Sequence, residues 1–342
     1  MKKIAPANDL LAPIAESWWT HKDATSWLLI PGIAALFLGF LPDVSGWLTL
    51  TIAGIAMGMM LFIVTAGFTL VFGLMRVLNF GHSVFITLGA YSSHVVVKHN
   101  IPALFADSFL TNLLLLVSAT IFAMLLVSLV AVAFERILIR KVYNNELMQI
   151  LMTIGGLIVV EQAMFMIWGV ETVIVPKPTT FQGAWNSGNF VFEKYRLFAV
   201  IMGLILYSAL LVIFRRTKLG LVIRAGVENR EMVEAFGYNI KLLFTVVFVC
   251  GAALAAFGGV LWSFYEEEVS SNLGHSMTVS VFVVAICGGL GSITGCFVAA
   301  ILLGLLSNYV GYVAADLAHY TTILFMIAIL VWRPNGLIPL NE

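Results

Sequence analysis

Residues 109–134 read FLTNLLLLVSATIFAMLLVSLVAVAF and contain no charged side chain. A helix of about 20 apolar residues is long enough to cross the hydrocarbon layer of a bilayer. That layer holds no water to bond with the backbone, so only helices and closed barrels cross it, and barrel strands are short segments of alternating hydrophobicity. A continuous apolar run of this length therefore predicts a membrane-spanning helix.

Similar runs recur along the whole chain. Hydrophobic residues make up 61% of its 342 residues and charged residues 11%, against about 45–50% and about 25% in soluble domains. The candidate spans are 26–42, 47–72, 82–98, 109–134, 148–168, 196–214, 242–264, 276–290, 296–313 and 316–332. The sequence therefore predicts an all-α, polytopic membrane bundle with about ten spans, of which 82–98, 276–290 and 296–313 are short or broken by glycine.

Lysine and arginine indicate the orientation, because they accumulate on the cytoplasmic side of a membrane. With the N-terminus inside, ten spans leave 14 of the 18 basic residues in cytoplasmic segments and the other 4 outside, and both termini are then cytoplasmic. The outside loop 169–195 is rich in proline and glycine and is expected to be irregular. Since 18 acidic residues balance the 18 basic ones, the net charge does not indicate nucleic acid as a partner.

The predicted organisation has three parts. Residues 1–25 form a cytoplasmic or interfacial extension, either a short surface helix or a disordered tail, residues 26–334 form the transmembrane domain, and residues 335–342 form a C-terminal tail. The cytoplasmic loop 215–241 contains an amphipathic stretch, 225–237, which predicts a short helix. Such a helix either packs against its own bundle or offers a surface to a cytoplasmic partner.

Polar residues inside the apolar segments are candidates for a translocation path. Arg76, Asn79 and His82 are three residues apart and would share one side of a helix if the stretch is helical. Glu161 and Gln162 interrupt another apolar span. An ionisable group there is costly and should face water or the bundle interior. It either lines a path or makes a structural hydrogen bond to a neighbouring helix.

Glycine-rich breaks offer a second indication of a path. Residues 288–295 read GGLGSITG, and Gly81 interrupts the earlier polar stretch. Broken helices in transporters expose helix ends to a central path, although small residues also serve tight helix packing. Two such breaks favour the path. The residues predicted to line it are Asn79, His82, Glu161, Gln162, Gly288, Gly289, Gly291 and Ser292.

Motifs for several other functions are absent from the sequence. It contains no G-x-x-x-x-G-K-[ST] phosphate loop, no H-E-x-x-H metal helix and no G-x-S-x-G nucleophile elbow. The sequence therefore predicts a transport protein with no catalytic residues, metal or cofactor of its own. One alternative is a secondary transporter or channel that works without ATP, using Glu161 or His82 as an ion site. A second is an intramembrane enzyme, for which His82, Glu161 and Arg76 are the ionisable groups on offer.

Several blocks resemble the membrane permease subunits of bacterial branched-chain amino-acid ABC importers. In chain order they are GLMRVLNFGH (73–82), FITLGAY (85–91), RAGVENREMVEAFGYN (224–239), FVCGAALAAFGGVLW (248–262), GGLGSITGCFVAAILLGLL (288–306) and VWRPNGL (331–337). The GLMRVLNF run is more similar to the H-type than to the M-type subunit, although Ser83 stands where the H-type usually has glycine. Residues 1–45 lie outside the resemblance.

The resemblance implies a multi-pass subunit of the bacterial inner membrane that carries branched-chain or related amino acids. Related permeases carry urea, short amides or aromatic acids. It implies a second permease subunit, a paralogue, two cytoplasmic ATPases that bind the ATP, and a periplasmic solute-binding protein. It also makes the stretch 225–237 a coupling helix against the ATPase, with contacts from Ala225, Glu228, Asn229, Glu234, Ala235, Phe236 and Gly237.

Overall fold

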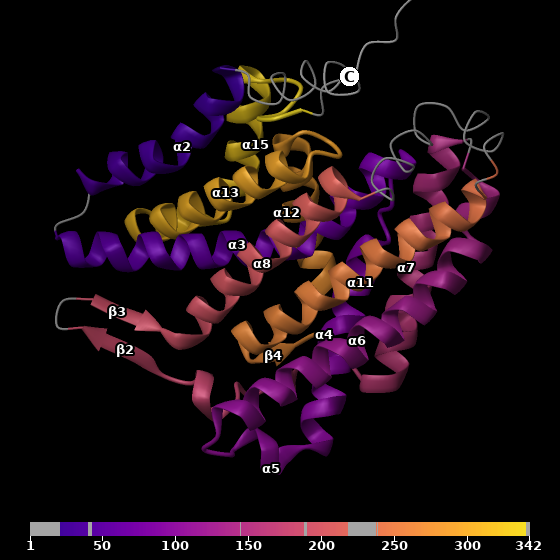
Figure 1. Cartoon of the computed structure of the whole chain (residues 1–342), viewed down its shortest axis with the longest axis horizontal. Coiled ribbons are helices and arrows are strands. Elements are labelled where there is room, and N and C mark those ends of the chain that lie inside the picture. The colour runs from indigo at the N-terminus through magenta and orange to yellow at the C-terminus, as the bar shows by residue number, and fades with distance from the viewer. Residues whose placement is uncertain are drawn as a thin grey trace, which may run out of the picture.

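The computed structural model is a helical bundle with two small sheets (Figure 1). It describes residues 21–39, 43–143, 145–187, 190–217, 237 and 239–339. The α-helices are α2 His21–Leu38, α3 Val44–Met75, α4 His82–His99, α5 Ile101–Leu104, α6 Phe109–Ile137, α7 Glu146–Trp168, α8 Lys194–Arg216, α11 Ile240–Glu266, α12 Leu273–Gly288, α13 Ile293–Val313, α14 Ala315–Ala318 and α15 Thr321–Trp332. The 3-10 helices are η1 Ile139–Lys141 and η2 Thr179–Phe181.

Nine of the ten predicted segments overlap a single helix and 316–332 is divided between α14 and α15, so the helical membrane architecture is confirmed. Within the described residues, six helices are long and apolar enough to cross a membrane, namely α3, α6, α7, α8, α11 and α13. The count of ten crossings stays a prediction. The 12 residues of α15 rise about 18 Å, which is less than the hydrocarbon thickness of about 30 Å.

Glycine brings the central helices together backbone to backbone. A Cβ atom at Gly67 of α3 would collide with the carbonyl of Gly251 on α11. A Cβ atom at Gly259 of α11 would likewise collide with the carbonyl of Ile86 on α4. Because lipid tails are as apolar as the side chains, such close packing is a main source of attraction between membrane helices. These contacts hold α3, α4 and α11 as the centre of the bundle.

Helices α6, α7 and α8 lie at the periphery. Only 17% of the most apolar window of α7 and of α8 is buried, and 28% of that of α6, compared with 83% for α3. On α7, Val159 is 68% exposed and Met166 is 86% exposed. In a membrane such apolar faces contact lipid or another protein chain.

The segment 169–195 is partly regular, so the expectation of an irregular loop is wrong. Strand β1 (Val173–Ile174) pairs antiparallel with β4 (Glu268–Val269), and β2 (Ala184–Ser187) pairs with β3 (Phe190–Glu193). The β2–β3 hairpin lies at the lower left of Figure 1, away from the top of the view, where the start of α2 and the end of α15 meet. Strands of two to four residues are too short to give a recognisable alternation of apolar and polar residues.

Candidate functional site

The chain between α3 and α4 is a loop rather than a helix. Helix α3 ends at Met75 because Arg76 adopts a left-handed conformation, with φ of 51°, and its N–H donates to the Phe72 carbonyl at 2.9 Å. Left-handed residues commonly end helices. The prediction that Arg76, Asn79 and His82 share one helical face is therefore wrong. Asn79 and His82 are instead joined by a turn, in which the His82 N–H donates to the Asn79 carbonyl at 3.2 Å.

This turn is held deep inside the bundle. Asn79 is 1% exposed, and neither its amide nitrogen nor its amide oxygen has a hydrogen-bond partner among the described residues. The next residue, Phe80, donates its N–H to Thr153 Oγ1 of α7 at 3.2 Å. A buried amide without partners destabilises the folded state. The Asn79 amide therefore has unused hydrogen-bonding capacity.

His82 opens α4 and lies beside α3. It is 2% exposed, its Nε2 lies 3.3 Å from the Val64 carbonyl, and its ring meets the ring of Phe68 at 70°. Ser83 and Thr87 follow on α4 at 3% and 1% exposure. We call Asn79, His82, Ser83 and Thr87 the polar core. It is closed to solvent in this conformation.

Sequence reasoning found Asn79 and His82 but missed Ser83 and Thr87. Hydroxyl side chains are weak signals, because in helices they often bond to a carbonyl one turn earlier. Thr87 does so, since its Oγ1 donates to the Ser83 carbonyl at 3.4 Å and accepts from the Gly274 N–H at 2.9 Å. The Ser83 hydroxyl has no partner among the described residues. The polar core therefore contains two side chains, Asn79 and Ser83, with unused hydrogen-bonding capacity.

The glycine-rich break exists as expected, but it is covered. Gly288 ends α12, and Ser292 caps α13 by accepting from the Gly295 N–H at 3.1 Å. The C-terminal tail lies on the break, where the N–H groups of Leu337 and Ile338 donate to the Cys287 and Gly288 carbonyls at 2.8 and 3.1 Å. These carbonyls are therefore satisfied by the chain itself. The arrangement agrees with the packing interpretation of this segment.

Positive φ angles make this packing possible. Gly289 and Gly291 have φ of 105° and 82°, and Gly336 in the tail has φ of 87°. A Cβ atom at Gly336 would lie 2.5 Å from the Gly289 backbone. The tail touches the break so closely that no side chain fits between them.

An arginine ties the tail to the first described helix. Arg333 donates to the Ser26 hydroxyl at 2.7 Å, to the Thr25 hydroxyl at 2.6 Å and to the Leu337 carbonyl at 2.7 Å. The Ser26 hydroxyl also donates to the Leu337 carbonyl at 2.9 Å. Helix α2 lies outside the sequence that resembles the permease family, whereas the tail to which it is bonded lies inside that sequence.

Glu161 and Gln162 lie apart from the polar core, on peripheral helix α7. Glu161 is half-buried and Gln162 is exposed, and the described residues make no ion pair with Glu161. Glu161 is eight residues beyond Thr153, which contacts the loop of the polar core, or about 12 Å along the helix. The structure therefore separates the predicted path residues into groups. Among the described residues, no set of His, Cys, Asp and Glu is arranged to hold a metal ion.

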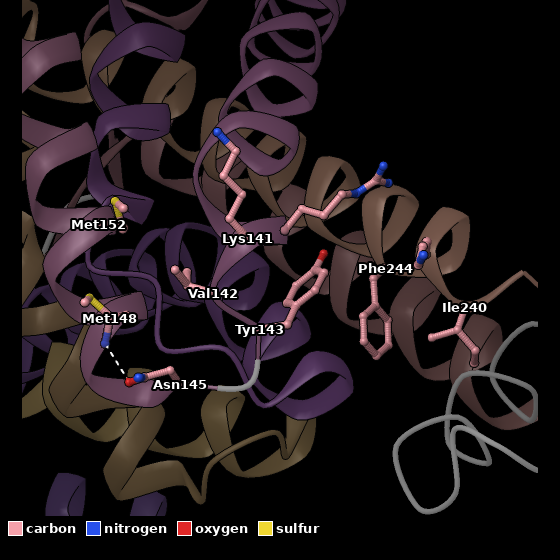
Figure 2. A pocket seen from close by; sticks show the side chains of 10 residues that line it. Lys141, Val142, Tyr143, Asn145, Met148, Met152, Ile240 and Phe244 are labelled. Carbon is pink, nitrogen blue, oxygen red and sulfur yellow. Dashed lines mark hydrogen bonds between the residues drawn. The ribbon is translucent and has the colours of Figure 1, made fainter.

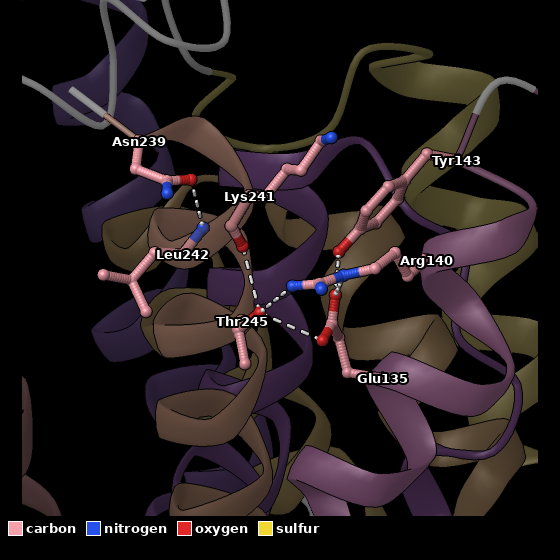
Figure 3. Close-up of polar contacts among 7 residues, drawn as sticks. All are labelled: Glu135, Arg140, Tyr143, Asn239, Lys241, Leu242 and Thr245. Atoms are coloured by element: carbon pink, nitrogen blue, oxygen red, sulfur yellow. Dashed lines mark hydrogen bonds and ion pairs between the residues drawn. The ribbon is translucent and has the colours of Figure 1, made fainter. Parts of the chain in front are cut away.

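A buried carboxylate paired with a partly exposed arginine lies at the end of the bundle that is predicted to be cytoplasmic (Figure 3). The Glu135 carboxylate is fully buried, accepts from the Tyr143 hydroxyl at 2.5 Å and from the Thr245 hydroxyl at 3.0 Å, and lies 3.5 Å from Arg140 Nε. Arg140 also donates to the Thr245 hydroxyl at 3.1 Å. We call Glu135, Arg140, Tyr143 and Thr245 the inner cluster. It joins the end of α6 to the start of α11.

The predicted coupling contacts Ala225, Glu228, Asn229, Glu234, Ala235 and Phe236 lie outside the described residues. Gly237 is described and has φ of 86°. Two residues later, Asn239 caps α11 by accepting from the Leu242 N–H at 3.1 Å. The predicted coupling segment thus leads directly into the helix that carries Thr245 of the inner cluster. Sequence reasoning missed this cluster because Glu135 and Arg140 read as ordinary charges at a span boundary.

A second group of charges lies at the opposite end. Lys177 Nζ forms ion pairs with Glu193 at 2.7 Å and with Glu267 at 3.0 Å, and Arg196 Nε forms an ion pair with Glu193 at 3.0 Å. We call these four residues the outer cluster. Burial of Lys177 favours the neutral amine, but hydrogen bonds and the charges of its two carboxylate partners outweigh burial and raise the pKa of Lys177. The cluster ties the 169–195 segment to the end of α11.

Comparison with known proteins identifies the family. Residues 50–332 match the model for the branched-chain amino acid transport system permease component. The chain belongs to this family. It is 27% identical to the high-affinity branched-chain amino acid transport system permease protein LivH of Escherichia coli K12 over 294 residues, which is 83% of this chain and 93% of that relative. It is 26% identical to BraD of Pseudomonas aeruginosa over 307 residues, 87% of this chain and 97% of that relative.

The comparisons also distinguish between subunit types. Similarity to LivM of Escherichia coli K12 reaches 28% identity but covers only 49% of this permease chain and 44% of that relative. The chain is therefore a permease of the H-type, as predicted, and a multi-pass membrane protein. The existence of LivH-type and LivM-type permeases implies a second permease subunit. No solved structure matches this chain.

Proposed function

We propose that this permease is one of two unlike membrane subunits of an ABC importer in the bacterial inner membrane, and that it forms part of the path for branched-chain or related amino acids. The match of residues 50–332 to the permease family carries this proposal. Two cytoplasmic ATPases bind the ATP, and a periplasmic solute-binding protein delivers the solute. The buried, partly unpaired polar core supports a role for Asn79 and His82 in contacting solute.

The exposed face of α7 supports contact with the second permease. Glu161 is half-buried on a helix whose neighbouring side chains are apolar and exposed, such as Ile158 at 50%. A carboxylate in contact with lipid at this depth would be costly, so a protein or water-filled surface is expected opposite it. Changing Glu161 to Gln should lower uptake more than abundance if the side chain faces the path. A fall in abundance with unchanged uptake per molecule would make the residue structural.

The two charged clusters support a gated mechanism. The inner and outer clusters lie at opposite ends of α11, and the polar core between them is closed. In alternating access, each end opens only while the other is shut, and each ligand favours one of the two states. Opening inward would disturb the inner cluster, which lies next to the predicted coupling segment. A movement of the coupling segment on ATP binding would therefore act directly on the inner cluster.

The coupling segment has its own test. The double change Glu234→Ala and Phe236→Ala should leave the permease in the membrane but separate ATP hydrolysis from uptake. The change Lys98→Ala, at the opposite end, serves as a matched surface control. Unchanged uptake in the double variant would refute the coupling role of residues 225–237.

One purification experiment tests the function as a whole. The tagged permease, expressed from its own operon, should bring down an ATPase subunit, and proteoliposomes of the complex should take up labelled leucine only with ATP. Urea, acetamide and phenylalanine, added as competitors, distinguish the other solutes carried in the family. If no ATPase co-purifies and an ion gradient drives uptake without ATP, the protein is a secondary transporter or channel instead.

A further inference from the structure

A pocket of about 670 Å³ lies beside the inner cluster, between α7 and α11. Figure 2 shows Met148 and Met152 of α7 on one side and Ile240 and Phe244 of α11 on the other. Its volume is within the range of about 300–1,000 Å³ found for small-molecule sites. Two of the residues that line the pocket, Arg140 and Tyr143, also belong to the inner cluster. The proposed transport function gives the pocket itself no role.

The charged side chains that the described residues contribute to the lining are all basic. Arg140, Lys141 and Lys241 line the pocket, and none of the described residues adds a carboxylate to the lining. The described residues supply one ion-pair partner, Glu135, which is 3.5 Å from Arg140, and none for Lys141 or Lys241. Glu146 begins α7 nearby but is not part of the lining. The pocket therefore attracts an anionic group.

The apolar part of the lining excludes a simple soluble anion as the best fit. Met148 is 46% exposed and Met152 is 39% exposed, and the same face of α7 continues with Leu151 at 57% and Val159 at 68%. A basic patch at one end of an exposed apolar helix face matches a molecule with an anionic head and a hydrocarbon tail. Basic pockets between membrane helices on the cytoplasmic side bind anionic lipid head groups.

We propose that this pocket binds one anionic phospholipid of the cytoplasmic leaflet. The phosphate lies among Arg140, Lys141 and Lys241, and an acyl chain follows Met148 and Met152 along α7. The Arg140 side chain is oriented by its contacts with the inner cluster, since its guanidinium donates to Thr245 and pairs with Glu135. The bound lipid therefore lies against the inner cluster and stabilises the arrangement in which α6 and α11 are joined.

The test is a lipid titration of the purified full chain in neutral detergent, followed by native mass spectrometry. Dioleoyl phosphatidylglycerol should bind, and dioleoyl phosphatidylcholine should not. The double variant Lys141→Gln and Lys241→Gln should weaken phosphatidylglycerol binding about 25-fold, or about fivefold for each lysine near the surface. The variant Lys98→Gln with Lys194→Gln, at the opposite end, should bind as the unmodified chain does.

Two further measurements distinguish the alternatives. Glycerol 3-phosphate at millimolar concentration should not displace the lipid. If it does, the pocket is a site for soluble phosphates and the lipid proposal fails. Replacement of both lysines by arginine should restore binding, because the charge is retained. Equal binding of phosphatidylglycerol by the glutamine variant, with an unchanged melting temperature, would also overturn the proposal.

Discussion

Replacement of Glu135 by alanine tests the importance of the inner cluster. The carboxylate is fully buried and accepts hydrogen bonds from Tyr143 at 2.5 Å and Thr245 at 3.0 Å. Its removal takes away the acceptor of this Tyr143 hydrogen bond. Thr245 loses one acceptor but keeps the Lys241 carbonyl at 2.9 Å.

The magnitude follows from these contacts. A hydrogen bond to a charged group contributes about 1.5–3 kcal/mol. Part of this loss is offset, because the variant no longer bears the desolvation cost of a buried carboxylate. The Arg140 side chain is 37% exposed, so its share is that of a solvent-screened pair, below about 1 kcal/mol. We expect a net loss of about 2–3 kcal/mol for Glu135→Ala and about 1 kcal/mol for Glu135→Gln, which keeps the volume and one acceptor. At about 2–4 °C per kcal/mol, the alanine variant should melt about 5–10 °C lower.

Two assays read out this prediction. Thermal unfolding of the detergent-purified permease gives the shift, and hydrogen exchange gives its location. Faster exchange is expected in the first turns of α11, around Thr245, and at the end of α6. Glu171→Ala is the matched control, because that carboxylate is exposed and makes no ion pair among the described residues. If the Glu135→Ala variant melts within about 1 °C of the unmodified chain, with unchanged exchange in α11, the cluster does not join these helices.

Three further changes test other contacts. Gly259→Ala places a Cβ atom against the carbonyl of Ile86 and should destabilise the fold by about 3 kcal/mol or more. The variant should lose its monodisperse peak in size-exclusion chromatography. Gly155→Ala is the control, because its Cβ atom meets nothing within 4 Å, and it should be neutral or slightly stabilising. Lys177→Gln should cost about 1–2 kcal/mol. Because the pKa of Lys177 is raised from 10.5, this cost should be constant at neutral pH and disappear only as the pH rises above about 10.5, measured as the difference between the melting curves of the two proteins. Gly336→Ala should detach the tail from the glycine break and make it sensitive to limited proteolysis, whereas an unchanged cleavage pattern would contradict that contact.

The helices were predictable from the sequence because their cause is local. An apolar run such as 109–134 must bond its own backbone in a membrane, whatever its neighbours are. The end of α3 was not predictable in this way, since Arg76 is in a left-handed conformation without the glycine that usually marks it. Strand pairing between Val173 and Val269 depends on residues 96 positions apart, and short strands carry no pattern of their own.

The candidate site shows the same limit. Asn79 and His82 stood out because polar groups are rare in apolar segments, and both are buried. The glycine break at 288–292 left two interpretations open, and only the hydrogen bonds from the tail favour packing. The inner cluster joins Glu135 to Thr245, which are 110 residues apart. No spacing rule connects two such residues before the fold is known.

The distribution of glycine contacts indicates which parts can move during transport. Helices α3, α4 and α11 touch through backbone atoms at Gly67 and Gly259, and close-packed backbones do not slide without losing many contacts together. The peripheral helices α7 and α8 have only 17% of their apolar windows buried, so their movement breaks fewer contacts. Displacement of α7 would pull on the loop of the polar core, because Phe80 of that loop is bonded to Thr153 of α7. The inner cluster, which joins α6 to α11, opposes displacement of α6 from the side of the predicted coupling segment.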